Sequence, residues 1–196
     1  GSTFKSFVIA RALEDKVITE QSQFFCENGS YVVGRHTIHD THPHGNLDPK
    51  GILQVSSNIC AAKVGQKLGR ETLVDTFQRF GFAERVGLGL PGEVKGMLPF
   101  PRAEITLATQ SFGQGVTASP LQVTAAYAAI ANKGVLMKPR LVNRLLAPDL
   151  TVMSRPGTED LGRAVSRDTA AKLTTMMEAV VASGTGTRAR IDGVTV

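Results

Sequence analysis

Hydrophobic residues recur every three or four positions along much of this chain, which is the spacing of a helix with one buried face. The pattern predicts helices over residues 4–13, 50–68, 70–80, 105–108 and 120–132, and a last helix that begins after Ser166. The first helix is apolar on most of its sides, so we expect it to be buried against more than one layer. The last ends at Gly184-Thr185-Gly186-Thr187, and we interpret its methionines as core filler.

Turn and capping signals divide the chain between these helices. Ser119-Pro120-Leu121-Gln122 is a near-ideal helix start, because the serine can cap, the proline fits the first turn and the glutamine completes a capping box. Asn28-Gly29 lies between the apolar runs 24–26 and 31–33 and predicts a β-hairpin. Residues 87–101 are rich in glycine and proline and predict an extended loop, and residues 136–146 favour a strand-like conformation.

The composition indicates one domain of ordinary size, or a large piece of one, because 196 residues with 42% apolar content can bury a core. No apolar run reaches the length of a membrane span, and no signal peptide opens the chain. The net charge of +5 is spread thinly, without a basic cluster interleaved with aromatics, which argues against a nucleic-acid partner. Cys26 and Cys60 can pair in an oxidising compartment, but we expect two free, partly buried thiols.

All four histidines and two aspartates fall in one short stretch, as His36, His39, Asp40, His42, His44 and Asp48. A metal site is one interpretation of this cluster. The spacing matches no closed zinc pattern, however, and the residues lie in a loop rich in threonine, proline and glycine. We therefore favour a polar loop near the functional site and expect no metal.

The first five residues, Gly1-Ser2-Thr3-Phe4-Lys5, place a serine three positions before a lysine at the start of an apolar helix. Positions i and i+3 share one helix face, so the Lys5 amine can reach the Ser2 hydroxyl. A serine becomes a nucleophile when a base takes its proton, and a lysine is that base only when burial or nearby positive charge keeps it neutral. Alone the pair is a weak signal, because Gly1-Ser2 is also what a cloning site leaves behind.

A second polar element, Ser56-Ser57-Asn58, falls inside the predicted helix over residues 50–68. A hydroxyl and an amide two residues apart cannot share a face of a regular helix. At an irregular helix start both can point into a cleft, where the hydroxyl can relay a proton and the amide can hold a substrate amide. Taken alone, a plain polar helix start explains the element better.

The two elements together, in this order and about fifty residues apart, resemble the active-site motifs of penicillin-binding proteins and β-lactamases. Over nearly all 196 residues the chain resembles the transpeptidase domain of class B penicillin-binding proteins, most closely the division-specific FtsI type. Gly1-Ser2 is then interpreted as native sequence. Further stretches that resemble the family are Asp40-Thr41-His42-Pro43-His44-Gly45, Ser111-Phe112-Gly113-Gln114-Gly115, Ser119-Pro120-Leu121-Gln122 and Gly184-Thr185-Gly186-Thr187.

The resemblance implies a peptidoglycan D,D-transpeptidase that cross-links the cell wall through a serine acyl-enzyme and is a target of β-lactams. Ser2 would attack the carbonyl of a D-alanyl-D-alanine stem peptide, with Lys5 as the general base. Ser56 would relay a proton to the leaving amine, and Asn58 would hydrogen-bond the substrate or Lys5. One oxyanion donor would be the backbone N–H of Ser2, because a helix N-terminus favours negative charge. The implied substrate-binding positions are Ser57, Gly113 and Gln114.

The resemblance also implies a setting for the reaction. The parent protein would be anchored in the inner membrane, with this domain facing the periplasm or the cell exterior. Its partners would be peptidoglycan stem peptides, β-lactam antibiotics and proteins of the division machinery, and it would need no cofactor.

One departure from the family is that its third motif, Lys-Thr-Gly, does not occur, since Thr185-Gly186 follows Gly184. The family builds its central sheet from segments before the first motif and from the third motif onward. We therefore expect residues 1–196 to be a partial transpeptidase domain that is mainly α with a small β-hairpin. It would be the helical part of the α/β penicillin-binding-protein and serine β-lactamase-like fold, with the central sheet largely missing, and inactive by itself.

Two other functions stay open at this point. A D,D-carboxypeptidase or a β-lactamase of the same superfamily would hydrolyse the acyl-enzyme, which requires a base for the attacking water, and the sequence offers no clear acidic candidate. The second is a non-catalytic fragment of a wall-synthesis complex. Labelling by a fluorescent penicillin distinguishes these functions.

Overall fold

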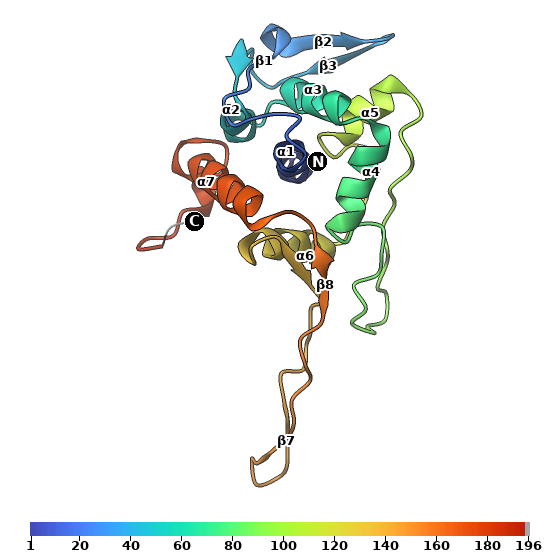
Figure 1. Ribbon diagram of the computed structural model, residues 1–196, viewed down its shortest axis with the longest axis vertical. Helices are drawn as coiled ribbons and strands as arrows, with labels where there is room; N and C mark the ends of the chain where they lie inside the picture. Colours follow the sequence, from blue (N-terminus) through green and yellow to red (C-terminus); the bar gives the residue numbers. More distant parts are fainter. Residues whose placement is uncertain (195–196) are drawn as a thin grey trace.

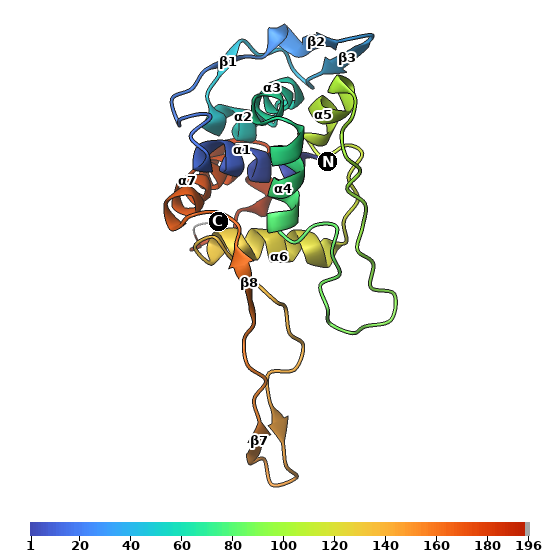
Figure 2. The same ribbon diagram turned by 45° about the vertical axis from the view of Figure 1, so that its right-hand side comes forward.

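The computed structural model describes residues 1–194 as a cluster of helices with a projecting arm (Figures 1 and 2). The helical elements are η1 (Ser2–Phe4), α1 (Lys5–Glu14), η2 (Glu27–Gly29), α2 (Pro49–Val55), α3 (Asn58–Leu68), α4 (Arg70–Arg79), α5 (Glu104–Gln110), α6 (Pro120–Ala131), α7 (Arg167–Ser183) and η3 (Thr187–Ala189). The strands are β1 (Phe24–Phe25), β2 (Ser30–Val33), β3 (His36–His39), β4 (Asn46–Leu47), β5 (Val135–Met137), β6 (Leu145–Leu146), β7 (Val152–Ser154) and β8 (Asp160–Arg163). These strands pair two by two and antiparallel, so the prediction of a mainly α fold is confirmed. None of the helices in this range combines the length and apolar character that a membrane crossing requires.

The α1 helix lies at the centre of the cluster, and Figure 1 shows it nearly end-on with the other helices around it. It packs against α2, α3, α4 and α7. Its first six residues, Lys5 to Ala10, are all buried, as is Ala12. The prediction of burial against more than one layer is therefore confirmed.

Aromatic rings anchor the first turns of α1. The Phe4 ring lies 5.2 Å from Phe77 and 4.7 Å from Phe82, measured between ring centroids. The Phe7 ring lies 4.7 Å from Phe80. Each such pair contributes about 0.5–1.5 kcal/mol beyond the burial of its area. The end of α4 and the residues after it therefore fix where α1 begins.

The helices with the clearest capping and periodic signals form where the sequence predicts them. Ser119 and Gln122 make a complete capping box, with Gln122 N donating to Ser119 Oγ at 3.2 Å and Ser119 N donating to Gln122 Oε1 at 2.8 Å. Ser166 caps α7 through a hydrogen bond that its Oγ accepts from Thr169 N. The predictions for residues 70–80, 105–108, 120–132 and the last helix are confirmed as α4, α5, α6 and α7. Residues 87–101 form the predicted extended loop.

The prediction of one helix over residues 50–68 is wrong, because the helix breaks between α2 and α3. Ser56 ends α2 in the left-handed conformation, with φ 59° and ψ 43°. Ser57 then begins α3, and its Oγ accepts a hydrogen bond from Cys60 N at 3.0 Å. Serine side chains compete with the helical backbone for hydrogen bonds, which is why two of them together can end one helix and start another.

The predicted hairpin across Asn28-Gly29 is wrong in its pairing. Both residues adopt positive φ, of 48° and 94°, but they lie in the short turn η2. The β1 strand that precedes them pairs with β4, and the β2 strand that follows pairs with β3 around Gly34. The side chains of Phe24 and Cys26 are buried, so β1 is held against the helical core and is not available to β2.

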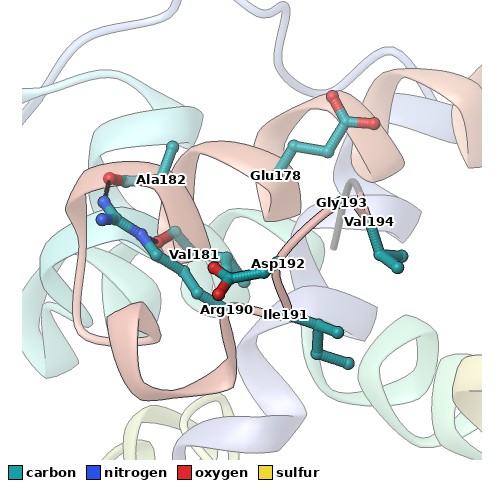
Figure 3. Close-up of a pocket in the computed structure, with 8 residues that line it drawn as sticks. All are labelled: Glu178, Val181, Ala182, Arg190, Ile191, Asp192, Gly193 and Val194. Carbon is teal, nitrogen blue, oxygen red and sulfur yellow. Dashed lines mark hydrogen bonds between the residues drawn. The ribbon is translucent and has the colours of Figure 1, made fainter.

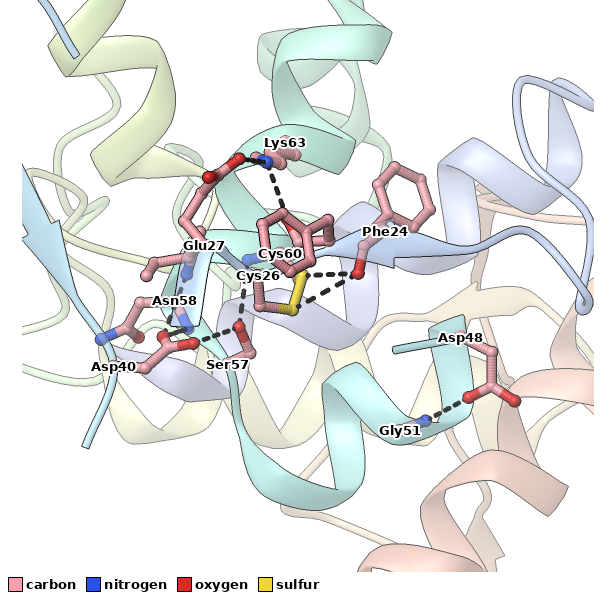
Figure 4. Close-up of a disulfide and its surroundings, with 12 residues drawn as sticks. Phe24, Cys26, Glu27, Asp40, Asp48, Gly51, Ser57, Asn58, Cys60 and Lys63 are labelled. Carbon is pink, nitrogen blue, oxygen red and sulfur yellow. Dashed lines mark hydrogen bonds and ion pairs between the residues drawn. A yellow bond between two sulfur atoms is a disulfide. The ribbon is translucent and has the colours of Figure 1, made fainter. Parts of the chain in front are cut away.

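The expectation of two free thiols is also wrong, since Cys26 and Cys60 form a disulfide with their Cα atoms 5.2 Å apart. Figure 4 shows this bond joining the chain after β1 to the first turn of α3. Nearby, Lys63 forms an ion pair with Glu27 and donates a hydrogen bond to the Phe25 carbonyl. The disulfide and the Lys63 contacts thereby tie the start of α3, and the turn before it, to the segment that contains β1 and η2.

Residues 135–163 project from the helical cluster as a long two-stranded arm (Figures 1 and 2). At its base β5 pairs with β8, and near its tip β6 pairs with β7. The prediction of an extended segment over residues 136–146 is confirmed for β5 and β6. The returning strands β7 and β8 were not predicted, because their residues are exposed and lack an alternating apolar pattern.

We expect Gly65→Ala to destabilise the protein by about 1–3 kcal/mol, because overpacking forces neighbours apart. A Cβ at Gly65 would lie 1.7 Å from Ser111 Oγ, where α3 crosses the end of α5. Urea denaturation measures the change, and Gly157→Ala is the control, since a Cβ there meets no atom within 4 Å. The double variant with Ser111→Gly should recover part of the loss. An equal loss in single and double variants would contradict the steric explanation.

Candidate active site

The Ser2-Lys5 pair lies at the start of the central helix. Ser2 is exposed in η1, and Lys5 is the first residue of α1, one helical turn further on. Phe4 N donates a hydrogen bond to the Gly1 carbonyl at 3.0 Å, which closes the turn that carries the serine. The spacing of one turn between Ser2 and Lys5 is present, and the Lys5 amine makes its hydrogen bonds to Ser56.

Lys5 is the most unusual residue of the site, because only 1% of its surface is exposed. Its Nζ donates hydrogen bonds to Ser56 Oγ at 2.9 Å and to the Ser56 carbonyl at 2.5 Å. Burial lowers the pKa of Lys5 to about 8, and the negative charge of Asp40 opposes this by raising it. The amine is therefore partly neutral near physiological pH and can accept a proton.

The left-handed conformation of Ser56 turns its hydroxyl and carbonyl toward Lys5. A non-glycine residue in this conformation is uncommon and is kept there by its surroundings. Ser56 N donates to the carbonyls of Ile52 and Leu53, so the end of α2 holds it from one side while Lys5 holds it from the other. The break between α2 and α3 thus brings the Ser56 hydroxyl to the amine of Lys5.

A cavity of about 270 Å³ opens over these groups. Ser2, Lys5 and Ser56 line it together, and α6 and α7 supply much of the remaining wall. The other lining residues are Thr3, Ser6, Leu53, Tyr127, Met177, Val180, Val181 and Thr185. An exposed serine, a partly neutral lysine and a second hydroxyl in one cavity can carry out acyl transfer through the serine.

Comparison with known proteins identifies the family. All of residues 1–196 match the family described as the penicillin-binding protein transpeptidase domain. The chain belongs to this family. It is 34% identical to the penicillin-binding protein PbpB of Mycobacterium tuberculosis (strain ATCC 25618 / H37Rv), over 98% of this chain and 30% of that protein. It is 33% identical to the peptidoglycan D,D-transpeptidase FtsI of Escherichia coli (strain K12), over 98% of this chain and 31% of that protein.

Solved structures share the fold of this transpeptidase chain. The transpeptidase domain of Burkholderia pseudomallei penicillin-binding protein 3 is 31% identical and superposes with a TM-score of 0.86, over 100% of this chain and 57% of that one. Penicillin-binding protein 3 of Mycobacterium tuberculosis in complex with aztreonam is 33% identical, with a TM-score of 0.86, over 97% of this chain and 45% of that one. The chain spans about a third of the length of the curated relatives that it matches.

The remaining residues of the second motif point away from the cavity. The Ser57 side chain is buried, with 1% of its surface exposed, and its Oγ donates to Asp40 Oδ2 at 2.6 Å. This hydroxyl caps α3, and Ser57 is not among the residues that line the cavity over Ser2. The amide of Asn58 donates to the His39 carbonyl at 3.0 Å and lines a separate groove of about 280 Å³.

The two predicted residues of the glycine turn differ in their positions. Gly113 has φ 85°, and a Cβ there would lie 2.2 Å from the Gly1 carbonyl oxygen. Only glycine permits this close approach to the residue before Ser2, so Gly113 shapes the backbone beside the nucleophile. The exposed side chain of Gln114 lines the same groove as Asn58 and not the cavity over Ser2.

Several residues of the cavity were not predicted from the sequence. The Tyr127 hydroxyl donates to the Thr3 carbonyl at 2.9 Å and pairs with Ser6 Oγ at 3.1 Å, and burial raises the pKa of this tyrosine. Tyr127 followed the apolar spacing of α6 and gave no signal of its own. The interpretation of the methionines as core filler holds for buried Met176, whereas Met177 lines the cavity.

The four histidines lie in β3 and in the loop that follows it, on the side of the second motif that faces away from the cavity over Ser2. Among residues 1–194 no group of three or more His, Cys, Asp or Glu side chains is arranged to hold a metal ion.

A further pocket lies between the end of α7 and residues 190–194 (Figure 3). There Arg190 donates hydrogen bonds to the carbonyls of Val181 and Ala182, so its guanidinium closes the end of the helix.

The buried lysine predicts a pH dependence of stability. The folded state holds the pKa of Lys5 at about 8, and unfolding returns it to about 10.5. Between these values the unfolded chain binds more protons, so the free energy of unfolding rises with pH across this window. We expect wild type to gain stability relative to Lys5→Met as pH rises from 8 to 10.5, measured by urea denaturation. A difference that stays constant over this range would show that Lys5 titrates normally.

Proposed function

We propose that the protein containing this chain is a peptidoglycan D,D-transpeptidase, with Ser2 as nucleophile and Lys5 as general base. The single observation that carries the proposal is the contact of the Lys5 amine with Ser56 Oγ at 2.9 Å, inside the cavity that also holds Ser2. A lysine buried in this way is a base at neutral pH, and a serine one helical turn away is within its reach. Residues 1–196 would be one part of the transpeptidase domain.

The first half of the proposed reaction forms an acyl-enzyme. Ser2 Oγ bonds to the carbonyl carbon of the penultimate D-alanine of a stem peptide, while its proton passes to the Lys5 amine. The oxyanion faces the N-terminus of α1, where the Ser2 backbone N–H is a donor. Collapse of the tetrahedral intermediate breaks the C–N bond, and the Ser56 hydroxyl passes a proton from Lys5 to the leaving D-alanine amine.

The second half transfers the acyl group to an amine of a neighbouring stem peptide. That amine attacks the Ser2 ester carbonyl and loses a proton to Lys5, and Ser2 Oγ regains a proton as it leaves. Asn58 can orient one of the peptides from the groove beside β3 if its amide exchanges the His39 carbonyl for substrate. β-Lactams would acylate the same serine, in keeping with the solved complexes of Mycobacterium tuberculosis penicillin-binding protein 3 with aztreonam and with ampicillin.

Transfer is favoured over hydrolysis by the lining of the cavity. A carboxypeptidase or β-lactamase needs a base for the deacylating water. Within the described part of the chain, no residue that lines the cavity over Ser2 is acidic. This supports an acyl-enzyme that is not readily hydrolysed by water and that persists until an acceptor amine attacks it.

The disulfide supports a location outside the cytoplasm. Disulfides persist in oxidising compartments such as the periplasm and the cell exterior. The Cys26–Cys60 bond therefore fits a domain on the outer side of the inner membrane, in a parent protein that is anchored there. Division-machinery proteins would be its partners, in keeping with its similarity to FtsI.

We expect Ser2→Ala in the full-length protein to abolish covalent labelling by a fluorescent penicillin, because the variant lacks the nucleophile. Ser2 is exposed, so its melting temperature should stay at the wild-type value. The control is Ser30→Ala, which removes another exposed serine and should label normally. Labelling is measured by gel fluorescence and located by mass spectrometry. An adduct that persists in Ser2→Ala would remove Ser2 as the nucleophile.

We expect Lys5→Arg to lower the acylation rate about 10²- to 10⁴-fold, the usual contribution of a general base. Arginine keeps the positive charge but does not lose its proton at working pH. Stopped-flow acylation of the full-length protein measures the rate, and Lys50→Arg on exposed α2 is the matched control. A near-normal rate in Lys5→Arg would show that Lys5 acts only through its charge or its packing.

A further inference from the structure

The carboxylate of Asp40 lies against the N-terminus of α3, beside Ser57 and Asn58 of the second motif (Figure 4). Its Oδ2 accepts a hydrogen bond from Ser57 Oγ at 2.6 Å. Its Oδ1 accepts from Asn58 N at 2.5 Å and from Ile59 N at 3.1 Å. One side chain from the end of β3 thus holds three consecutive residues of the turn and the helix start.

The neighbouring backbone strengthens this contact. The carbonyl of His39 accepts a hydrogen bond from the Asn58 amide, so residues 39 and 40 together hold both the side chain and the main chain of Asn58. Ser57 already caps α3 through Cys60 N. Asp40 satisfies two further N–H groups of the helix start, those of Asn58 and Ile59, and in addition binds the Ser57 hydroxyl, which a cap of the helix backbone does not require.

Hydrogen bonds consequently hold the turn from two sides. Lys5 binds the hydroxyl and carbonyl of Ser56, and Asp40 binds Ser57 and Asn58. Ser56 is in the left-handed conformation, which a non-glycine residue keeps only when its surroundings impose it. If the hydrogen bonds to Asp40 are removed, the turn can relax and Ser56 Oγ can move away from the Lys5 amine.

Asp40 also acts on Lys5 through its charge. Within residues 1–194 the charged groups that act on the Lys5 amine are the Asp40 carboxylate and the amino group of Gly1. Asp40 raises the pKa of Lys5 against the larger effect of burial. Removal of this negative charge would move the pKa of Lys5 below about 8.

We propose that Asp40 is a positioning residue for acyl transfer: its carboxylate fixes the Ser56-Ser57-Asn58 turn so that Ser56 Oγ stays on the Lys5 amine. The inference rests on the proposed function for its consequence in catalysis. The coupling of Asp40 to Lys5, through the hydrogen bonds of the turn and through charge, does not depend on the proposed function.

The test is Asp40→Asn in the full-length protein, with Asp48→Asn as the matched control. Asp48 caps α2 by accepting from Gly51 N at 2.6 Å, so both substitutions remove the charge of an aspartate at a helix start, but only Asp40 touches the second motif. Two quantities are measured across pH 6–10. One is the ¹³Cε chemical shift of Lys5 in lysine-labelled protein, and the other is the rate of acylation by a penicillin.

In Asp40→Asn we expect the Lys5 titration to shift to lower pH and the plateau rate of acylation to fall about 10- to 100-fold, as for other small misplacements of reacting groups. The midpoint of the acylation profile should shift down together with the titration. In Asp48→Asn both midpoints and the plateau rate should match wild type. A cap that serves only stability would lower the melting temperature of both variants alike and move neither midpoint.

Ser57→Ala is the second variant, in case Asp40→Asn fails to fold. It removes one of the three hydrogen bonds to Asp40, together with the cap on Cys60 N, and keeps the charge, so we expect a smaller loss of acylation rate and a Lys5 titration at the wild-type position. An unshifted Lys5 titration in Asp40→Asn, or a wild-type acylation rate in both Asp40→Asn and Ser57→Ala, would overturn the inference. A wild-type protein whose Lys5 titrates as described but which is never acylated would instead overturn the proposed function. In that case the ¹³Cε comparison between wild type and Asp40→Asn still tests the coupling.

Discussion

The burial of the Lys5 amine is the constraint on which the rest of the site depends. Removal of an amine from water is costly unless its protons find acceptors. Within the described chain the hydrogen bonds of the Lys5 amine go to Ser56, which lies 51 positions further on. The chain must therefore present a hydroxyl and a carbonyl at that point, and it does so with a serine in the left-handed conformation between two helices. The same burial that makes this contact necessary also lowers the pKa of the lysine, so the structural requirement and the chemical one have a single cause.

Three layers of contacts hold this arrangement in place. The aromatic rings around Phe4 fix the start of α1 and with it the Ser2 hydroxyl. Asp40 and the Cys26–Cys60 disulfide fix the start of α3 from the opposite direction. Gly113 allows the turn after α5 to approach Gly1 closely. Each contact joins segments that are distant in sequence, which is why the reactive groups occupy defined positions although Ser2 itself lies in an exposed short turn.

The accuracy of the sequence-based predictions follows the range of the interactions involved. The α4, α6 and α7 helices were predicted correctly because capping residues and apolar periodicity act within one or two turns. The same local rules failed at Asn28-Gly29, where the turn forms but burial of Phe24 and Cys26 directs β1 to β4. They failed again at Ser56, where each flanking segment favours a helix. Only a contact from Lys5 and a cap for α3 make the break at this serine favourable.

From the sequence by itself one could determine most of the helices, the spacing of Ser2 and Lys5 by one helical turn, and the motifs that mark the transpeptidase family. These features are local or depend on the order of residues along the chain. Only the tertiary structure decided that Ser56 ends α2 in the left-handed conformation, that Tyr127 and Met177 form part of the cavity wall, and that Asp40 holds the second motif. Those assignments depend on burial and on hydrogen bonds between distant segments, and the energy of such contacts exists only once the chain has folded.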